Sequence, residues 1–107
     1  MNKNKPFRFN KKTSNLFRAI LSLKTLREAE CFFRDLCTAE ELLAMSERWA
    51  IAQMVEKGFS YRDIADSLKV STTTVARVAF WLENGMGGYK AALGHHHSSR
   101  SSGKGLR

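Results

Sequence analysis

Long apolar runs and cysteine are scarce in this sequence, and each scarcity argues against a class of protein. No stretch approaches the roughly 18 apolar residues that a membrane-spanning helix needs. No apolar run follows the basic N-terminus, as it would in a signal peptide. We therefore expect a soluble, cytoplasmic protein that does not enter a membrane. Cys31 and Cys37 form no CxxC motif and have no matching second pair, which predicts buried free thiols in a reducing compartment.

The sequence also lacks the residue patterns of an enzyme, a metal site or a nucleotide-binding loop. Its histidines, His95 to His97, are adjacent in a Ser-rich tail, which makes a poor defined metal site. Whether this run is natural or an added segment stays open. The pair Gly87-Gly88 follows no predicted strand and lacks the GxxxxGK[ST] order. We predict a protein that is not an enzyme, with no catalytic residue, no cofactor and no metal.

Positive charge is concentrated at the two ends of the chain. The formal net charge is +8, yet residues 13–94 contain ten Lys or Arg and ten Asp or Glu. This pattern predicts a basic flexible arm over 1–12, a folded domain over 13–94 and a flexible Ser/His/basic tail over 95–107. In this arm Phe7 and Phe9 stand among lysine and arginine residues. The arm could follow a DNA backbone, or it could be a disordered solubilising tail.

Helical spacing of apolar residues and helix-capping residues divide the domain into short helices. Ser14 is a candidate cap for a helix over Asn15–Leu23, Thr25 opens a second helix that runs through Leu36, and Thr38 opens the longest helix, which ends near Lys57 with Gly58 as the stop. The first two helices carry more apolar surface than so small a domain can cover. A symmetric dimer would cover it and would set two DNA-reading heads roughly 34 Å apart.

Residues Ser60–Leu82 have the pattern of a helix-turn-helix. Ser60 and Ser71 are N-caps of two successive short helices, and Lys69-Val70 makes the turn between them. Inward apolar positions follow at helical spacing: Ile64, Ala65, Leu68, Val75, Val78, Ala79 and Leu82. A left-handed residue in the turn would be Lys69, at a cost on the order of 1 kcal/mol. Small helical hairpins in proteins that never bind DNA share such spacing, so the outer face must supply further support.

The outward positions of the second helix suit DNA. Its outward residues are Thr72, Thr73, Ala76 and Arg77. Thr72, Thr73 and Arg77 are candidates for contacts with base edges, and Lys69, Ser71, Thr74 and the lysines of the two tails for contacts with phosphates. Short hydroxyls and methyls fit a groove, and arginine can pair with a guanine or a phosphate. A short last helix after Asn84-Gly85 is anchored by Tyr89 and Leu93.

The run from Phe17 through Leu93 resembles the Trp-repressor-like family, in particular its YerC/YecD branch. The resemblance lies in the segments LFRAILSLKT, FFRDLCTAEELLAM, YRDIADSLKVSTTTVARV and LENGMGGYKAAL. It implies an all-α fold of about six helices in an intertwined homodimer. It also implies that Arg62, on the first helix of the pair, contacts operator DNA, and that Thr72, Thr73, Thr74 and Ala76 meet the groove and backbone.

The resemblance further points to a possible effector pocket of Glu47, Arg48, Arg77 and Val78. In tryptophan-sensing members two arginines sandwich the indole of the corepressor, and Arg77 matches one of them. The other aligns with Glu47, while Arg48 is displaced by one position, which turns it about 100° away on a helix. Val78 stands where the family has a small glycine. The resemblance therefore implies DNA binding without tryptophan control, and leaves open whether another small-molecule corepressor binds.

Together these patterns predict a homodimeric, sequence-specific transcriptional regulator that binds double-stranded DNA. Repression is favoured over activation because no second domain is present to recruit a partner. Two alternatives stay open: a non-specific architectural DNA-binding protein whose tails supply the affinity, and a helix-turn-helix used as a protein-interaction module.

Overall fold

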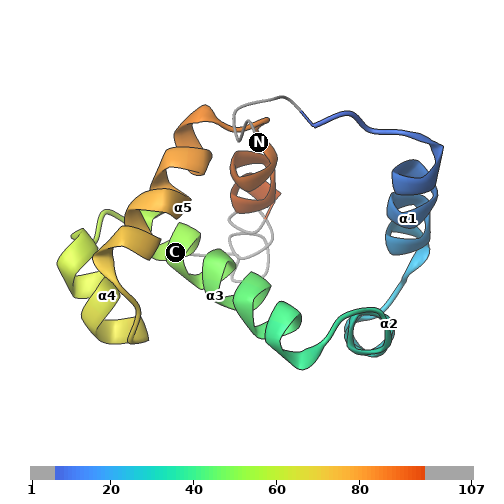
Figure 1. Ribbon diagram of the computed structural model, residues 1–107, viewed down its shortest axis with the longest axis horizontal. Coiled ribbons are helices and arrows are strands. Elements are labelled where there is room, and N and C mark those ends of the chain that lie inside the picture. Colours follow the sequence, from blue (N-terminus) through green and yellow to red (C-terminus); the bar gives the residue numbers. More distant parts are fainter. Residues whose placement is uncertain (1–6, 96–107) are drawn as a thin grey trace, which may run out of the picture. The chain divides into compact units, whose positions relative to one another are not determined.

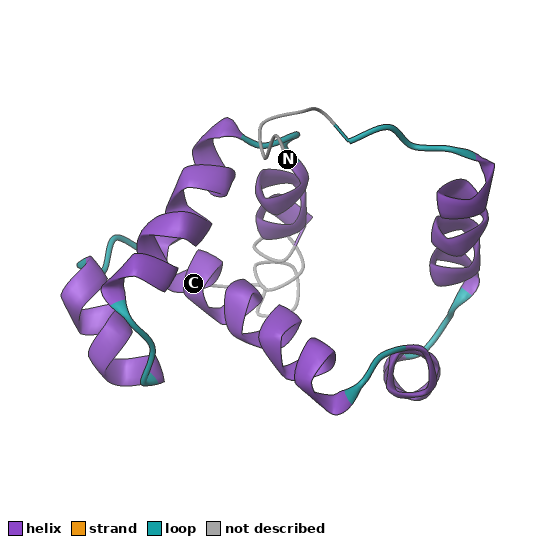
Figure 2. Ribbon diagram, viewed as in Figure 1, coloured by secondary structure: helices purple, strands orange, loops and turns teal. Residues whose placement is uncertain are grey.

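The computed structural model describes residues 7–95, and all regular structure in that range is helical (Figures 1 and 2). The helices are α1 (Lys11–Ser22), α2 (Leu26–Leu36), α3 (Ala39–Glu56), α4 (Tyr61–Leu68), α5 (Thr72–Asn84) and a last helix over 88–95. No strand occurs between residues 7 and 95. The predicted all-α class with about six helices is confirmed.

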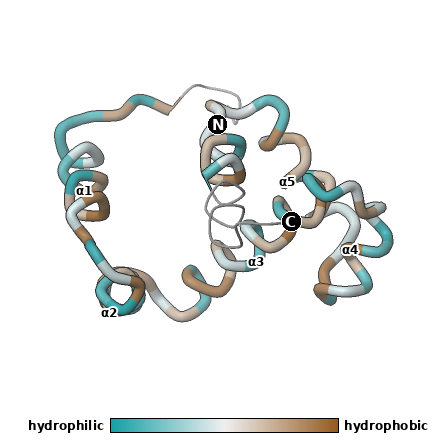
Figure 3. Tube along the Cα trace, turned by 180° about the vertical axis from the view of Figure 1, so that it is seen from behind, coloured by the Kyte–Doolittle hydropathy of each residue, from teal (hydrophilic) through white to brown (hydrophobic). Residues whose placement is uncertain are grey.

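The chain divides into two compact units, Met1–Leu42 and Leu43–Arg107. The described part of the first unit contains α1, α2 and the first turn of α3, and none of its residues 7–42 is buried. Large apolar side chains stand open on it, among them Phe17, Leu21, Leu26 and Leu36. Figure 3 shows hydrophobic and hydrophilic residues alternating along both helices. Taken alone, this unit has amphipathic helices and no core.

The start of α1 differs from the sequence prediction. Asn10, not Ser14, is the cap: its side chain accepts a hydrogen bond from the Thr13 amide, and the Thr13 hydroxyl accepts one from the Asn10 amide, at 3.0 and 2.9 Å. This reciprocal pair satisfies two amides that would otherwise lack partners, so the helix begins four residues early. Lys11 and Lys12, within the predicted arm 1–12, are therefore helical.

The predicted limits of α2 and α3 are confirmed. The Thr25 hydroxyl accepts a hydrogen bond from the Glu28 amide at 3.0 Å, and the Glu28 carboxylate accepts one from the Lys24 amide. At α3, Thr38 and Glu41 exchange hydrogen bonds of 2.9 and 3.0 Å, which makes a complete capping box. Gly58 follows α3 with φ +92°, a left-handed conformation that glycine adopts without strain.

The second unit holds the core. Ile51 and Ala52 of α3, Ile64 and Ala65 of α4, and Val75 and Val78 of α5 form one buried cluster. Trp49, Met54, Val55, Leu68, Val70 and Tyr89 pack around it. The predicted inward faces of α4 and α5 are confirmed, and α3 and the last helix complete the support of the helix pair.

Two predictions concern the cysteines and the chain ends. Cys31 and Cys37 are free thiols, but their predicted burial is wrong: Cys31 is exposed and Cys37 half-buried, because the unit that carries them has no core. His95 belongs to the last helix. The rest of the predicted tail, residues 96–107, and residues 1–6 of the arm lie outside the described part of the chain.

Candidate nucleic-acid interface

The helix-turn-helix is built from two caps and a strained turn. The Ser60 hydroxyl accepts a hydrogen bond from the Asp63 amide at 3.0 Å and begins α4. The Ser71 hydroxyl accepts one from the Thr74 amide at 3.0 Å and begins α5. Between the helices, the Val70 amide donates back to the Ala65 carbonyl at 3.0 Å. These local bonds fix where each helix starts, and α4 then packs on α5.

Lys69 takes the left-handed conformation predicted for the turn. Its φ and ψ are +60° and +46°, and it is the one non-glycine residue with positive φ in the described chain. A lysine there stores strain on the order of 1 kcal/mol that a glycine would avoid. Its side chain is exposed. The turn thus presents an ammonium group at the junction of the two helices.

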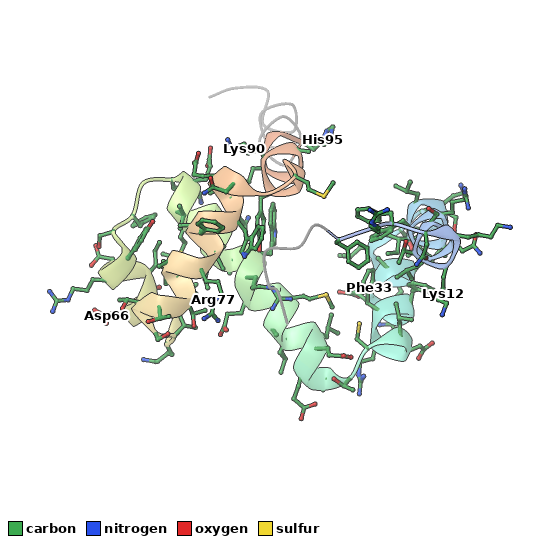
Figure 4. The ribbon with its side chains drawn as sticks, turned by 45° about the horizontal axis from the view of Figure 1, so that its top comes forward. Lys12, Phe33, Asp66, Arg77, Lys90 and His95 are labelled. Carbon is green, nitrogen blue, oxygen red and sulfur yellow. The ribbon has the colours of Figure 1, made fainter. Side chains whose placement is uncertain are left out.

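The candidate DNA-contacting residues lie on the open side of α4, the turn and α5. Arg62, Lys69, Ser71, Thr72, Thr73, Ala76 and Arg77 are exposed, and Thr74 is half-buried. The opposite face of α5 is buried, through Val75, Val78, Ala79 and Leu82. Figure 4 marks Arg77 on α5. The first turn of α5 contains no acidic residue, so its positive end is not neutralised by a side chain.

Two of the predicted phosphate contacts are already engaged within the protein. The Ser71 and Thr74 hydroxyl oxygens lie 3.0 Å apart in a hydrogen bond, and Ser71 also caps α5. Their hydroxyls shape the N-terminus of α5, leaving Thr72 and Thr73 as the hydroxyls of its exposed first turn.

A pocket of about 760 Å³ lies beside α5 in the second unit. All four residues of the predicted effector pocket line it: Glu47, Arg48, Arg77 and Val78. Arg48 follows Glu47 directly on α3, about 100° further round the helix, and still lines the pocket. A pocket of this size takes in side chains more than 100° apart on α3, so the neighbours Glu47 and Arg48 both reach it.

Three aromatic residues missing from the sequence prediction also line the pocket: Trp49, Trp81 and Tyr89. Trp81 follows Arg77 by four residues, and such pairs share one side of a helix, so this spacing could have identified it. Trp81 is half-exposed and its ring lies edge-on to Phe80, with centroids 5.3 Å apart. The pocket therefore combines indole walls with one carboxylate and two guanidinium groups.

Other kinds of site are not found in the described chain. Residues 7–95 contain no group of His, Cys, Asp and Glu arranged to hold a metal ion. Among the helices of the same range, none has the length and apolarity to span a bilayer.

Comparison with known proteins agrees with this geometry. The family model described as Trp repressor protein matches residues 11–97. A protein of Bacillus subtilis (strain 168), named YerC and described as uncharacterised, is 40% identical over 83 residues, which cover 78% of this chain and 80% of that protein.

Two solved structures are also similar. A TrpR-like protein from Eubacterium eligens aligns with a TM-score of 0.78 and 40% identity, over 82% of this chain and 91% of its own. A protein from Staphylococcus aureus, described as a candidate Trp repressor, aligns with a TM-score of 0.78 and 34% identity, over 83% and 89%. Together with the helix-turn-helix and its exposed face, these matches establish that the chain belongs to the Trp repressor family of DNA-binding regulators, in its TrpR-like YerC group.

Proposed function

We propose that the protein is a sequence-specific transcriptional repressor of the cytoplasm, which binds double-stranded DNA as a homodimer through Ser60–Leu82. The observation that carries this proposal is the exposed first half of α5, with two threonines, Ala76 and Arg77 on a face free of acids. Repression needs only occupation of a promoter, which tight binding of DNA supplies. Family membership supports regulation through DNA binding.

The homodimer is supported by the first unit. Residues 7–42 bury none of their side chains, while Leu21 is 84% and Leu26 76% exposed. Exposed apolar area of this kind marks an interface in a soluble protein. A symmetric partner presents the same surface in return and covers both copies.

Within the reading head, we assign base recognition to Arg62, Thr72, Thr73 and Arg77, and phosphate binding to Lys69, Ser71 and Thr74, with Ala76 beside them at the groove. Replacing Arg62 by Ala is expected to cost about 1–3 kcal/mol on the specific site and much less on random DNA. Titrations of both DNAs with both proteins measure this difference. An equal loss on the two DNAs would make Arg62 a phosphate contact only.

DNA binding is proposed to be independent of tryptophan. Glu47 brings a carboxylate into the pocket that would repel the carboxylate of the amino acid, and Val78 adds bulk to its wall. Arg48 acts in the opposite sense, because with Arg77 it supplies two guanidinium groups. Calorimetric titration with L-tryptophan is expected to give no saturable heat; saturation below millimolar concentration would contradict tryptophan independence.

The deciding experiment selects, from a mixture of fragments, the DNA that the protein binds. The protein is mixed with sheared DNA of its source organism, with and without L-tryptophan, and the retained fragments are sequenced. Palindromic fragments recovered equally in both conditions support the proposal. Recovery only with tryptophan would show that the pocket retains its corepressor. Uniform recovery that vanishes as salt rises would indicate a non-specific architectural protein, and no recovery would favour a protein-interaction module.

A further inference from the structure

The excess positive charge of this chain lies in its first quarter. Residues 1–27 contain eight Lys or Arg and no Asp or Glu, whereas residues 28–107 contain ten of each. The net charge of +8 is therefore carried entirely by the segment that ends just before Glu28. A one-signed segment of this length attracts a polyanion.

Part of this segment has a defined conformation. The Phe7 and Phe9 rings meet edge to face with centroids 4.9 Å apart, and the Phe9 ring lies 6.2 Å from the ring of Phe17 on α1. Asn10, next in sequence, is locked to Thr13 by the capping box. The rings and the cap hold the chain against α1 from residue 7 onward, with Arg8 between the two phenylalanines.

Three exposed basic residues lie within five positions of one another in the sequence, at the start of α1. Arg8, Lys11 and Lys12, here called the arm cluster, are all exposed. Within residues 7–42 of the first unit, no ion pair joins any of these three side chains to a carboxylate. The two lysines stand in the first turn of α1, where the helix dipole favours acids; α2, α3 and α4 each carry an acid there. Helix stability alone therefore does not account for these lysines.

We propose that the arm cluster is a second DNA contact, which binds phosphates outside the bases read by α5. This inference rests on the proposed function, since it adds to the affinity of the same DNA complex. Each phosphate contact releases counterions and strengthens binding without reading sequence. DNA is favoured over an acidic membrane because the family already binds this polyanion through its reading head.

The test compares the full-length chain with the variant R8Q/K11Q/K12Q. Two probes are used: a random-sequence duplex and a fragment recovered by the DNA selection. The slope of log affinity against log salt is expected to fall by about 0.9 for each phosphate that the variant no longer binds, hence by about 2.7 per chain if all three side chains bind one. The affinity for both probes should fall by the same factor, so that their ratio is unchanged.

A control variant separates local contact from overall charge. K24Q/R27Q/K90Q removes the same number of exposed positive charges from elsewhere in the chain. Its salt slope is expected to stay within about one phosphate contact of the unmodified protein. Equal salt slopes in the two variants would overturn the proposal. It would also be overturned if R8Q/K11Q/K12Q bound only the selected fragment more weakly and the random duplex as before, because the arm cluster would then read bases.

Two further measurements keep the outcomes distinct. If no fragment is selected, the proposed function fails, yet the slope on the random duplex still tests the arm cluster. Sedimentation with vesicles of equal phosphatidylserine and phosphatidylcholine tests the membrane; vesicle binding that disappears in R8Q/K11Q/K12Q while the DNA slopes stay unchanged would overturn the proposal. Circular dichroism should show α1 intact, because removing cations from its positive end does not disfavour the helix.

Discussion

At the scale of the residue, Lys69 places a charge at a position where the backbone prefers glycine. Lys69→Gly is expected to raise the free energy of unfolding by about 1 kcal/mol, because glycine adopts positive φ without strain. The same change removes an exposed ammonium group and should weaken binding to all DNA sequences alike. Urea unfolding and DNA titration measure the two effects.

Lys69→Ala is the matched control for that prediction. Alanine loses the charge but keeps the strain, so DNA binding should weaken as in the glycine variant while stability stays near that of the unmodified protein. If alanine stabilised the protein as much as glycine, the strain at Lys69 would not be the cause.

At the scale of the element, α5 depends on its cap. Ser71→Ala removes the acceptor of the Thr74 amide and the partner of the Thr74 hydroxyl, and is expected to cost about 1 kcal/mol of stability. Ser71→Asp, which restores an acceptor, should recover the stability but repel phosphate. A stable alanine variant with unchanged DNA affinity would show that the cap is dispensable.

The starts of the helices show which parts of the fold could be predicted from the sequence alone. Caps at Thr25, Thr38, Ser60 and Ser71 were predictable because each is a local pattern of a hydroxyl and an amide three residues on. Asn10 was missed because it lies in a basic run that resembled a tail, where composition outweighed a capping pair with Thr13.

The residues that line the pocket could be predicted only in part. The positions of Glu47, Arg77 and Val78 around one pocket followed from the family resemblance. Arg48 was included with them, although a rotation of 100° per residue does not tell whether one pocket is wide enough to take in two neighbouring side chains. Trp49 and Trp81 were not among the predicted pocket residues, because that prediction used only the positions that match the two arginines and the glycine of the tryptophan-sensing members.

At the scale of the whole molecule, the first unit predicts the oligomeric state. Leu21 is 84% exposed on a helix with no core beneath it. Leu21→Asp places a charge on this apolar surface and is expected to shift the protein from dimer to monomer in analytical ultracentrifugation.

Asn15→Asp is the control, because it adds the same charge at an exposed polar position of the same helix and should leave the dimer intact. A monomeric parent protein, or a dimer that tolerates Asp at position 21, would contradict an interface on α1. The sequence could indicate this need for association through its surplus of apolar residues, but the surface that meets it follows from the absence of buried residues in 7–42.

The lining of the pocket gives the protein its own optical reporter. The chain contains two tryptophans, Trp49 and Trp81, and both line the same pocket. Fluorescence excited at the red edge of the absorption band, where tyrosine does not absorb, therefore comes only from the two tryptophans of this pocket. Filling of the pocket by a small molecule that does not itself fluoresce, or its rearrangement when α5 meets DNA, can be followed in unlabelled protein, and replacing either indole by phenylalanine separates the contributions of α3 and α5.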